Sequence, residues 1–177
     1  MRKLNLGCGG NILAGWENHD ADLDISKVLP YEIKSIDLIF AEHVCEHLTT
    51  PDVVMFFNEC YRILKNGGIV RIAVPSVVKI FDNVDERYLR WFGNSGFGHP
   101  TKRSAIQSIL LNHGHLSAWD HSILGACLFA SGFDEDKIFP FTVGHSATKE
   151  LCGIEGHGKV IGDHNNEIET IVMEAVK

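Results

Sequence analysis

Residues 3–10 read KLNLGCGG, a short strand followed at once by three glycines in four positions. Glycines at Gly7, Gly9 and Gly10, around Cys8, allow the backbone to turn sharply where the strand ends. They also let main-chain N–H groups approach an anionic ligand without an intervening side chain. A tight glycine turn that binds no ligand remains open as an alternative.

The spacing of these glycines argues against a nicotinamide site. A dinucleotide fingerprint needs a glycine or alanine three positions after Gly9, but Ile12 stands there. No room remains for a full crossover helix before Trp16. An NAD-dependent reductase is therefore a weaker hypothesis than the other enzymes considered below.

Strand and helix patterns alternate along the next sixty residues. This alternation favours a parallel sheet covered on both faces. The expected elements are a strand at 16–20, a strand at 36–41, a short helix at 42–48, a helix that is capped by Thr50 and stops at 66–68, and a buried strand at 69–74.

The second half of the chain has a weaker pattern at first. Glycines interrupt any period between residues 76 and 119, and this segment is expected to face the substrate. Asp120 then caps a helix that stops at Gly132. Two final strands, at 137–143 and 168–176, are expected to be antiparallel neighbours because little helix separates them.

Length and composition predict one soluble domain over residues 1–177. The chain is 45% hydrophobic and 22% charged, with no run of apolar residues near the roughly 20 needed to cross a bilayer. No signal peptide is apparent, so a cytoplasmic location and no membrane partner are expected.

Five widely spaced cysteines without a CxxC predict reduced thiols. The formal net charge of −7 makes nucleic acid a poor substrate hypothesis.

Three acids follow the presumed second strand in five residues: Asp20, Asp22 and Asp24. A carboxylate at this point of a Rossmann-like sheet can accept hydrogen bonds from both hydroxyls of a ribose. Solvated turn acids and a divalent cation site are the alternatives. Together with the glycines shortly before it, Asp20 favours ribose binding.

Residues 43–47 contain an H-x-x-E-H motif, in which His43 and His47 could hold zinc and Glu46 could act as base. The alternative is that His47 packs under the sheet while Glu42 and His43 cap the strand end at the ligand crevice. One or two further histidines could face the substrate. They are His99, His113, His115, His121, His145 and His157.

Five segments together resemble successive motifs of class I S-adenosylmethionine-dependent methyltransferases. The similarity is closest to short, bacterial-type methyltransferases that open with GCGGN followed by GWxNxD. It covers residues 3–76 well and the C-terminal region more loosely. The segments are 4–10 (LNLGCGG), 15–20 (GWENHD), 36–48 (IDLIFAEHVCEHL), 61–68 (YRILKNGG) and 72–75 (IAVP).

The resemblance implies an α/β fold, the Rossmann-like class I methyltransferase three-layer sandwich, with a mostly parallel sheet and an antiparallel last strand. The first crossover helix has almost no room at residues 11–15, and the stretch between Asp20 and Asp24 has none for the usual helix and third strand. We therefore expect a reduced sheet of about six strands. Covering of the substrate is expected from residues 76–119 or from a second subunit.

The resemblance also implies where S-adenosylmethionine binds, within a cofactor half at residues 1–76. Gly7, Cys8, Gly9 and Gly10 would wrap the methionine part of the cofactor. Asp20 would bind the ribose hydroxyls.

Four further residues are implied in the site. Asp24 would lie near the adenine amine, and Ala41, Glu42 and His43 would line the cofactor and face the substrate. A general base is needed only for a hydroxyl or a protonated amine acceptor, and His43 and Glu42 are the candidates by position. No metal ligand set is expected.

The sequence therefore predicts a methyltransferase enzyme that acts on a small-molecule or glycan acceptor. The formation of a homo-oligomer stays open. The main alternative is a non-catalytic or degenerate protein that binds S-adenosylmethionine or S-adenosylhomocysteine. A zinc hydrolase built on the H-x-x-E-H motif is the remote alternative.

Overall fold

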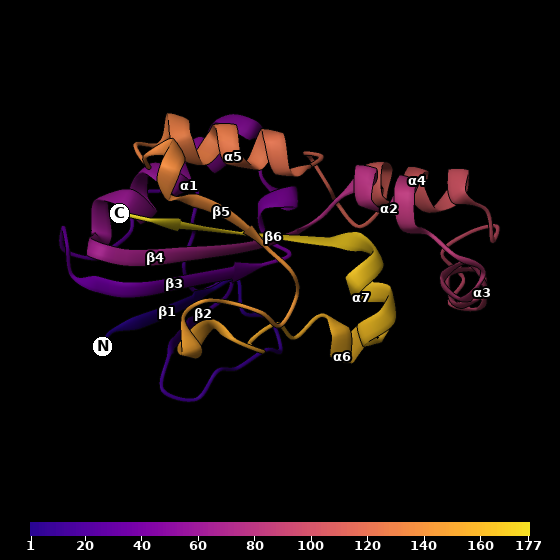
Figure 1. Cartoon of the computed structure of the whole chain (residues 1–177), viewed down its shortest axis with the longest axis horizontal. Coiled ribbons are helices and arrows are strands. Elements are labelled where there is room, and N and C mark those ends of the chain that lie inside the picture. The colour runs from indigo at the N-terminus through magenta and orange to yellow at the C-terminus, as the bar shows by residue number, and fades with distance from the viewer.

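The computed structural model describes residues 1–177 and contains a six-stranded sheet (Figure 1). The strand order is β2-β1-β3-β4-β6-β5. The strands are β1 (Lys3–Leu6), β2 (Glu17–His19), β3 (Ile36–Glu42), β4 (Leu64–Pro75), β5 (Ile138–Phe141) and β6 (Thr170–Val176). The helices are α1 (Thr50–Ile63), α2 (Val77–Asn83), α3 (Glu86–Asn94), α4 (Lys102–Leu111), α5 (His121–Ala130), α6 (Gly158–Ile161) and α7 (Asp163–Glu169), with 3₁₀ turns η1 (Cys45–His47), η2 (Glu135–Lys137) and η3 (Lys149–Leu151).

The sheet has the predicted mixture of strand directions. Strands β2, β1, β3 and β4 are parallel, and β6 is antiparallel to both of its neighbours, β4 and β5. No helix connects β1 to β2. The predictions of a mostly parallel α/β fold, six strands and an antiparallel final pair are therefore confirmed.

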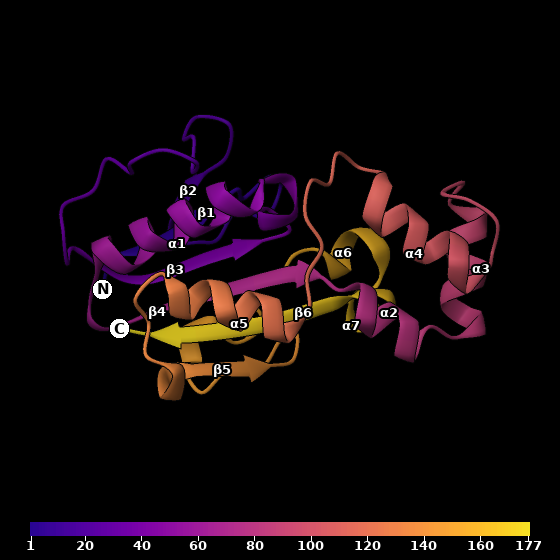
Figure 2. The same ribbon diagram turned by 90° about the horizontal axis from the view of Figure 1, so that it is seen from above.

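Helices α1 and α5 lie together on one face of the sheet (Figures 1 and 2). Alternate residues of β4, Val70, Ile72 and Val74, belong to the same buried cluster of 25 residues as Phe57 of α1 and Leu128 of α5. Side chains on a strand point to opposite faces in turn, so these three point to the helical side. This cluster is the main core of the protein.

The opposite face is covered by irregular chain, the segment between β5 and α6, which lies below the sheet in Figure 1. Its anchor is Arg71 of β4, whose side chain is 0% exposed. The guanidinium forms ion pairs with Glu155 of this segment and with Glu174 of β6, and it donates to the carbonyl of His145 at 2.9 Å. Arg71 and Glu174 are direct partners across the β4–β6 ladder. A buried ionic cluster therefore holds the segment to the sheet.

Helices α2, α3 and α4 form a lobe with α6 and α7 at one end of the sheet, on the right in Figure 2. A second, smaller buried cluster joins α2, α3, α4 and α7. It consists of Ile80, Tyr88, Phe92, Ala105 and Ile168. Because α2 begins two residues after β4 ends, the lobe lies at the edge where the parallel strands finish.

Two predicted boundaries of helix α1 were wrong: its cap lies one residue earlier, and sheet pairing takes the residues that were expected to stop it. Helix α1 is capped by Thr49, whose hydroxyl accepts from the N–H of Asp52, and it ends at Ile63. Residues 66–68 lie inside β4. They do not stop the helix, since Gly67 N–H donates to the carbonyl of Lys177 at 2.7 Å, within the pairing of this strand with the C-terminus.

The structure also differs from the sequence prediction at residues 42–48 and 76–119. The helix expected at 42–48 is reduced to the 3₁₀ turn η1, because β3 continues through Glu42 and the next N–H, of His43, donates to the carbonyl of Ala73 at 2.9 Å. Residues 76–119, which lacked a clear period, contain α2, α3 and α4. The predicted cap of α5 by Asp120 is confirmed.

All five cysteines are free, as predicted, and four of them are buried. None of the helices combines the length and the hydropathy that crossing a bilayer would require.

Replacing Arg71 by methionine should leave two buried carboxylates, Glu155 and Glu174, without their cationic partner. We expect Arg71→Met to lower the free energy of unfolding by about 3–5 kcal/mol, the usual cost of breaking a buried ion pair on one side. Urea denaturation followed by circular dichroism measures the loss. The control is Arg90→Met, since Arg90 forms an exposed pair with Glu86 that should contribute no more than about 1 kcal/mol. Equal losses in the two variants would show that the ionic cluster does not hold the segment.

Candidate functional site

The turn after β1 has the geometry of a ligand cradle. Gly7 and Gly9 adopt φ angles of 65° and 47°, in the left-handed region that favours glycine. A Cβ atom on Gly7 would lie 2.2 Å from Cγ2 of Val44, so this position is also too close to its neighbour for a side chain. A Cβ atom on Gly9 or Gly10 would meet no atom within 4 Å. These two glycines therefore border open space that a ligand can fill.

The space beside the glycines is a cavity of about 340 Å³, here called the glycine cavity. It lies where β1 and β3 end, the place where ligands bind in open parallel sheets. Its volume is within the range of small-molecule sites, roughly 300–1,000 Å³. The lining residues are Gly7, Cys8, Gly9, Gly10, Asn11, Glu42, His43, Gly156, His157, Lys159 and Val160.

One wall of the glycine cavity comes from the C-terminal segment, and Glu42 holds it there. The two oxygens of the Glu42 carboxylate accept N–H groups of Gly156 at 2.7 Å and His157 at 3.1 Å. Asn11 donates to the carbonyl of Ile154 at 2.8 Å. A Cβ atom on Gly156 would lie 2.4 Å from the Asn11 side chain, so only glycine allows this approach. The carboxylate of Glu42 is thus occupied by backbone donors.

A second cavity, of about 290 Å³, adjoins the first and is here called the histidine cavity. The two cavities share His43, His157 and Val160 in their linings. Its other lining residues are three aromatic groups, Trp91, Phe92 and Phe97, the polar groups Glu46, His47, Ser108, His113, His115 and Glu169, and Pro75, Ile109 and Ile161. Ligands in the two cavities would therefore meet at the His43 and His157 side chains.

The rings of His43 and His157 are stacked, with centroids 3.8 Å apart. His43 Nδ1 lies 3.1 Å from Oε1 of Glu46, and His43 Nε2 lies 3.0 Å from the hydroxyl of Thr170. His157 Nε2 lies 3.1 Å from Oε1 of Glu169. Each imidazole is therefore oriented by a carboxylate.

The surroundings perturb the protonation of this group of residues. Burial acts to lower the pKa of His43, but the contact with Glu46 and the negative charges of Glu169 and Glu42 outweigh it, so the pKa is raised. Burial, with the neighbouring Glu169, raises the pKa of Tyr88, which stays a neutral donor to that carboxylate at 2.7 Å.

The backbone of His43 is also unusual, because its φ of 52° is uncommon outside glycine. Backbone strain of this kind concentrates at functional sites.

The remaining predicted site residues are placed differently. Asp20 follows β2 directly and is exposed, outside the lining of the glycine cavity. Asp24 accepts hydrogen bonds from the N–H and the hydroxyl of Ser26, at 3.0 and 2.6 Å, and so caps a local turn. Ala41 is buried in the main core, on the side of α1 and α5. The cofactor contacts implied for these three residues stay predictions.

The sequence did not point to the C-terminal wall of the site. Gly156, Lys159 and Val160 had no motif that could have identified them. The histidines carried a signal: one or two of them were expected to face the substrate, and three line the cavities, His113, His115 and His157. Residues 76–119 contribute Trp91, Phe92 and Phe97 to the histidine cavity.

The H-x-x-E-H motif does not form the paired ligand set of a zinc peptidase. Both ring nitrogens of His43 already face Glu46 and Thr170. The ring of His47 lies against that of His115, with centroids 5.0 Å apart. The two histidines of the motif are not on successive turns of a helix, because only η1 forms here. The zinc hydrolase alternative is therefore not favoured.

Comparison with known proteins links this fold to methyltransferases. Residues 16–72 match a family model described as a methyltransferase domain. No curated protein matches the chain.

Solved structures are similar over nearly the whole chain. A phosphoethanolamine N-methyltransferase 2 from Haemonchus contortus, in complex with S-adenosyl-L-methionine, has a TM-score of 0.58 and 14% identity, and the match covers 100% of this chain and 48% of that one. A SAM-dependent methyltransferase from Archaeoglobus fulgidus has a TM-score of 0.57 and 14% identity, with 99% and 86% covered. An S-adenosylmethionine-dependent methyltransferase from Mesorhizobium loti has a TM-score of 0.54 and 12% identity, with 99% and 90% covered.

This chain spans about half the length of the Haemonchus protein. Because the sequence identities are only 12–14%, these similarities establish the fold and nothing further. The chain has the Rossmann-like fold of S-adenosylmethionine-dependent methyltransferases.

Proposed function

We propose that this protein transfers a methyl group from S-adenosylmethionine, bound in the glycine cavity, to a small acceptor bound in the histidine cavity. The observation that carries the proposal is the pair of adjoining cavities, with His43 and His157 in the wall between them. Methyl transfer requires two ligands whose reacting atoms meet in a fixed orientation. The methyltransferase-domain match at residues 16–72 supports the same chemistry.

The residues of the glycine cavity fit the proposed cofactor. Gly9 and Gly10 leave open space beside their backbone, which the methionine part of the cofactor would fill. Asp20, exposed just after β2, would accept hydrogen bonds from the ribose hydroxyls. When bound, S-adenosylmethionine supplies a methyl group on a positively charged sulfur, which becomes a neutral thioether when the methyl group leaves.

The protein's own contribution would be positioning, exclusion of water and, for some acceptors, removal of a proton. His43 and His157 both border the two cavities. His157 is the better-placed proton acceptor, because both ring nitrogens of His43 already contact Glu46 and Thr170, whereas His157 is held through Nε2 alone, by Glu169. Glu42, a candidate from the sequence, has its carboxylate occupied by the N–H groups of Gly156 and His157. Its role here would be to hold the cavity wall.

The acceptor is proposed to be a small molecule or a glycan unit. The histidine cavity measures about 290 Å³, at the small end of ligand sites. Its three aromatic rings and its carboxylates suit a compact acceptor with both apolar and polar parts. The net charge of −7 argues against a nucleic acid.

Calorimetric titration with S-adenosylmethionine and S-adenosylhomocysteine tests the cofactor site. We expect micromolar binding that Gly10→Val abolishes, because Gly10 lines the cavity and a side chain there would meet no protein atom, so it would occupy space meant for the ligand. Asp20→Ala should weaken binding about tenfold or more, the scale of losing a charged hydrogen bond. Asp136→Ala, at an exposed acid of η2, and NADH as ligand are the controls. Binding that Gly10→Val leaves intact would contradict the assignment of the cavity.

A transfer assay with methyl-labelled S-adenosylmethionine tests the acceptor. The panel holds small amines, phenols, thiols and sugars, beside RNA and protein. We expect label to move to one class of small molecule, and His157→Gln to lower kcat about 100-fold or more if that acceptor carries a proton on the attacked atom. Transfer to RNA or protein alone would contradict the small-acceptor proposal. Tight cofactor binding without any transfer would indicate a binding protein instead.

A further inference from the structure

The side chain of Glu46 is buried and has a single ion-pair partner. It is 1% exposed, and neither carboxylate oxygen accepts a hydrogen bond of normal geometry. The one ion-pair partner is His43, whose Nδ1 lies 3.1 Å from Oε1. Burial of a charge is costly unless it is paired and hydrogen-bonded, or binds a metal ion. The contact with His43 engages only Oε1, so a cation beside Oε2 would compensate the buried charge further.

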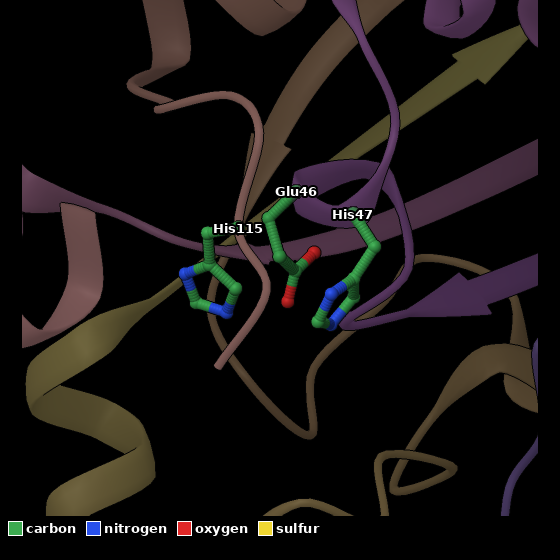
Figure 3. Close-up of side chains that lie close together, drawn as sticks. All are labelled: Glu46, His47 and His115. Atoms are coloured by element: carbon green, nitrogen blue, oxygen red, sulfur yellow. The ribbon is translucent and has the colours of Figure 1, made fainter. Parts of the chain in front are cut away.

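Two histidines complete a set of metal-binding atoms around this carboxylate. One ligand atom each from Glu46, His47 and His115 lie within 4.8 Å of one another. Figure 3 shows the Glu46 carboxylate between the two imidazole rings. All three side chains line the histidine cavity.

The backbone fixes this arrangement before any ion binds. His115 comes from a distant segment, which is tied to η1 because Leu116 and Ser117 donate N–H groups to the carbonyl of Glu46, at 2.7 and 3.2 Å. The Ser117 hydroxyl also donates to the carbonyl of Cys45 at 3.1 Å. Residue 115 is therefore held beside residues 46 and 47 by main-chain contacts.

The hydrogen bonding of His115 prepares its ring for a metal ion. Its Nδ1 lies 2.6 Å from the carbonyl oxygen of Ile109, an acceptor, so this nitrogen carries the proton. The lone pair of Nε2 is then free. Histidine ligands of metals commonly donate their other N–H to a backbone carbonyl, which fixes the tautomer and the ring orientation.

We propose that Glu46, His47 and His115 bind one divalent transition-metal ion, with Zn²⁺ the best match to two imidazoles and a carboxylate. Ligand atoms about 2.1 Å from an ion lie no more than about 4.2 Å apart, so a small rotation of the exposed His47 closes the set. Three protein ligands leave a coordination position open, as in catalytic zinc sites. That position faces the histidine cavity, so, resting on the proposed function, it would take an oxygen, nitrogen or sulfur atom of the acceptor.

This site differs from the H-x-x-E-H hypothesis, in which His43 and His47 were the ligands and Glu46 the base. Here Glu46 is itself a ligand, and His115, which lies 68 positions beyond His47 in the sequence, replaces His43. It also departs from the sequence-based expectation of no metal.

Titration of the untagged, chelator-treated chain of 177 residues with Zn²⁺ tests the site. We expect one equivalent to bind, and His115→Ala or Glu46→Gln to weaken the affinity about 100-fold or more, since loss of an outer-shell partner alone costs about 10–100-fold. His47→Ala should do the same, and because His47 is exposed this variant should fold normally by circular dichroism. His99→Ala, at an exposed histidine outside both cavities, is the matched control.

The outcomes separate this proposal from the proposed function. No Zn²⁺ binding at micromolar concentration, or equal binding by the wild-type chain and the His47→Ala and His115→Ala variants, overturns the metal site. S-adenosylmethionine binding is measured on the same samples. Cofactor binding without metal binding would reject only the metal site, whereas metal binding without cofactor binding would support the site and reject the proposed function.

Discussion

The buried charge of Arg71 is the constraint on which the rest of the structure depends. It lies in the middle of the sheet on the face away from α1 and α5, with no exposed surface. A guanidinium in that position needs several acceptors, because a buried charge without partners is strongly destabilising. Glu174 is supplied by the adjacent strand, directly opposite in register. Glu155 and the carbonyl of His145 come from the segment between β5 and α6, which is thereby fixed across this face.

The path of that segment explains the composition of the site. No helix forms in the short connection between β1 and β2. The face of the sheet that carries Arg71 is therefore open to another part of the chain. The anchored segment passes over it and reaches the glycine turn, where Asn11 and Glu42 bind its backbone. It thus closes one side of the glycine cavity and brings the ring of His157 onto that of His43. Stability and site geometry therefore depend on the same contacts.

The lobe of α2, α3 and α4 forms the other half of the site. It follows β4 directly, so it stands at the edge of the sheet where the parallel strands end. Its aromatic residues, such as Trp91 and Phe97, close the histidine cavity, and the segment after α4 carries His115 to Glu46. A compact cavity rich in histidine and carboxylate groups results beside the glycine cavity, so two ligands would lie next to each other there, as the proposed transfer requires.

The sequence by itself determined the features that depend on near neighbours along the chain. These are the glycine turn after β1, helices α1 and α5, the parallel strands, and the placement of Glu42 and His43 at the end of β3, because apolar periodicity and glycine spacing are local. Only the tertiary structure decided that residues 66–68 join a strand, since they pair with Lys177 at the other end of the chain. It alone also brought His157 and His115 into the site. His157 is held there by the contact of Arg71 with Glu155, 84 positions apart, and His115 by the N–H of Leu116, which donates to the carbonyl of Glu46. Such pairings between distant residues are not encoded in any local pattern.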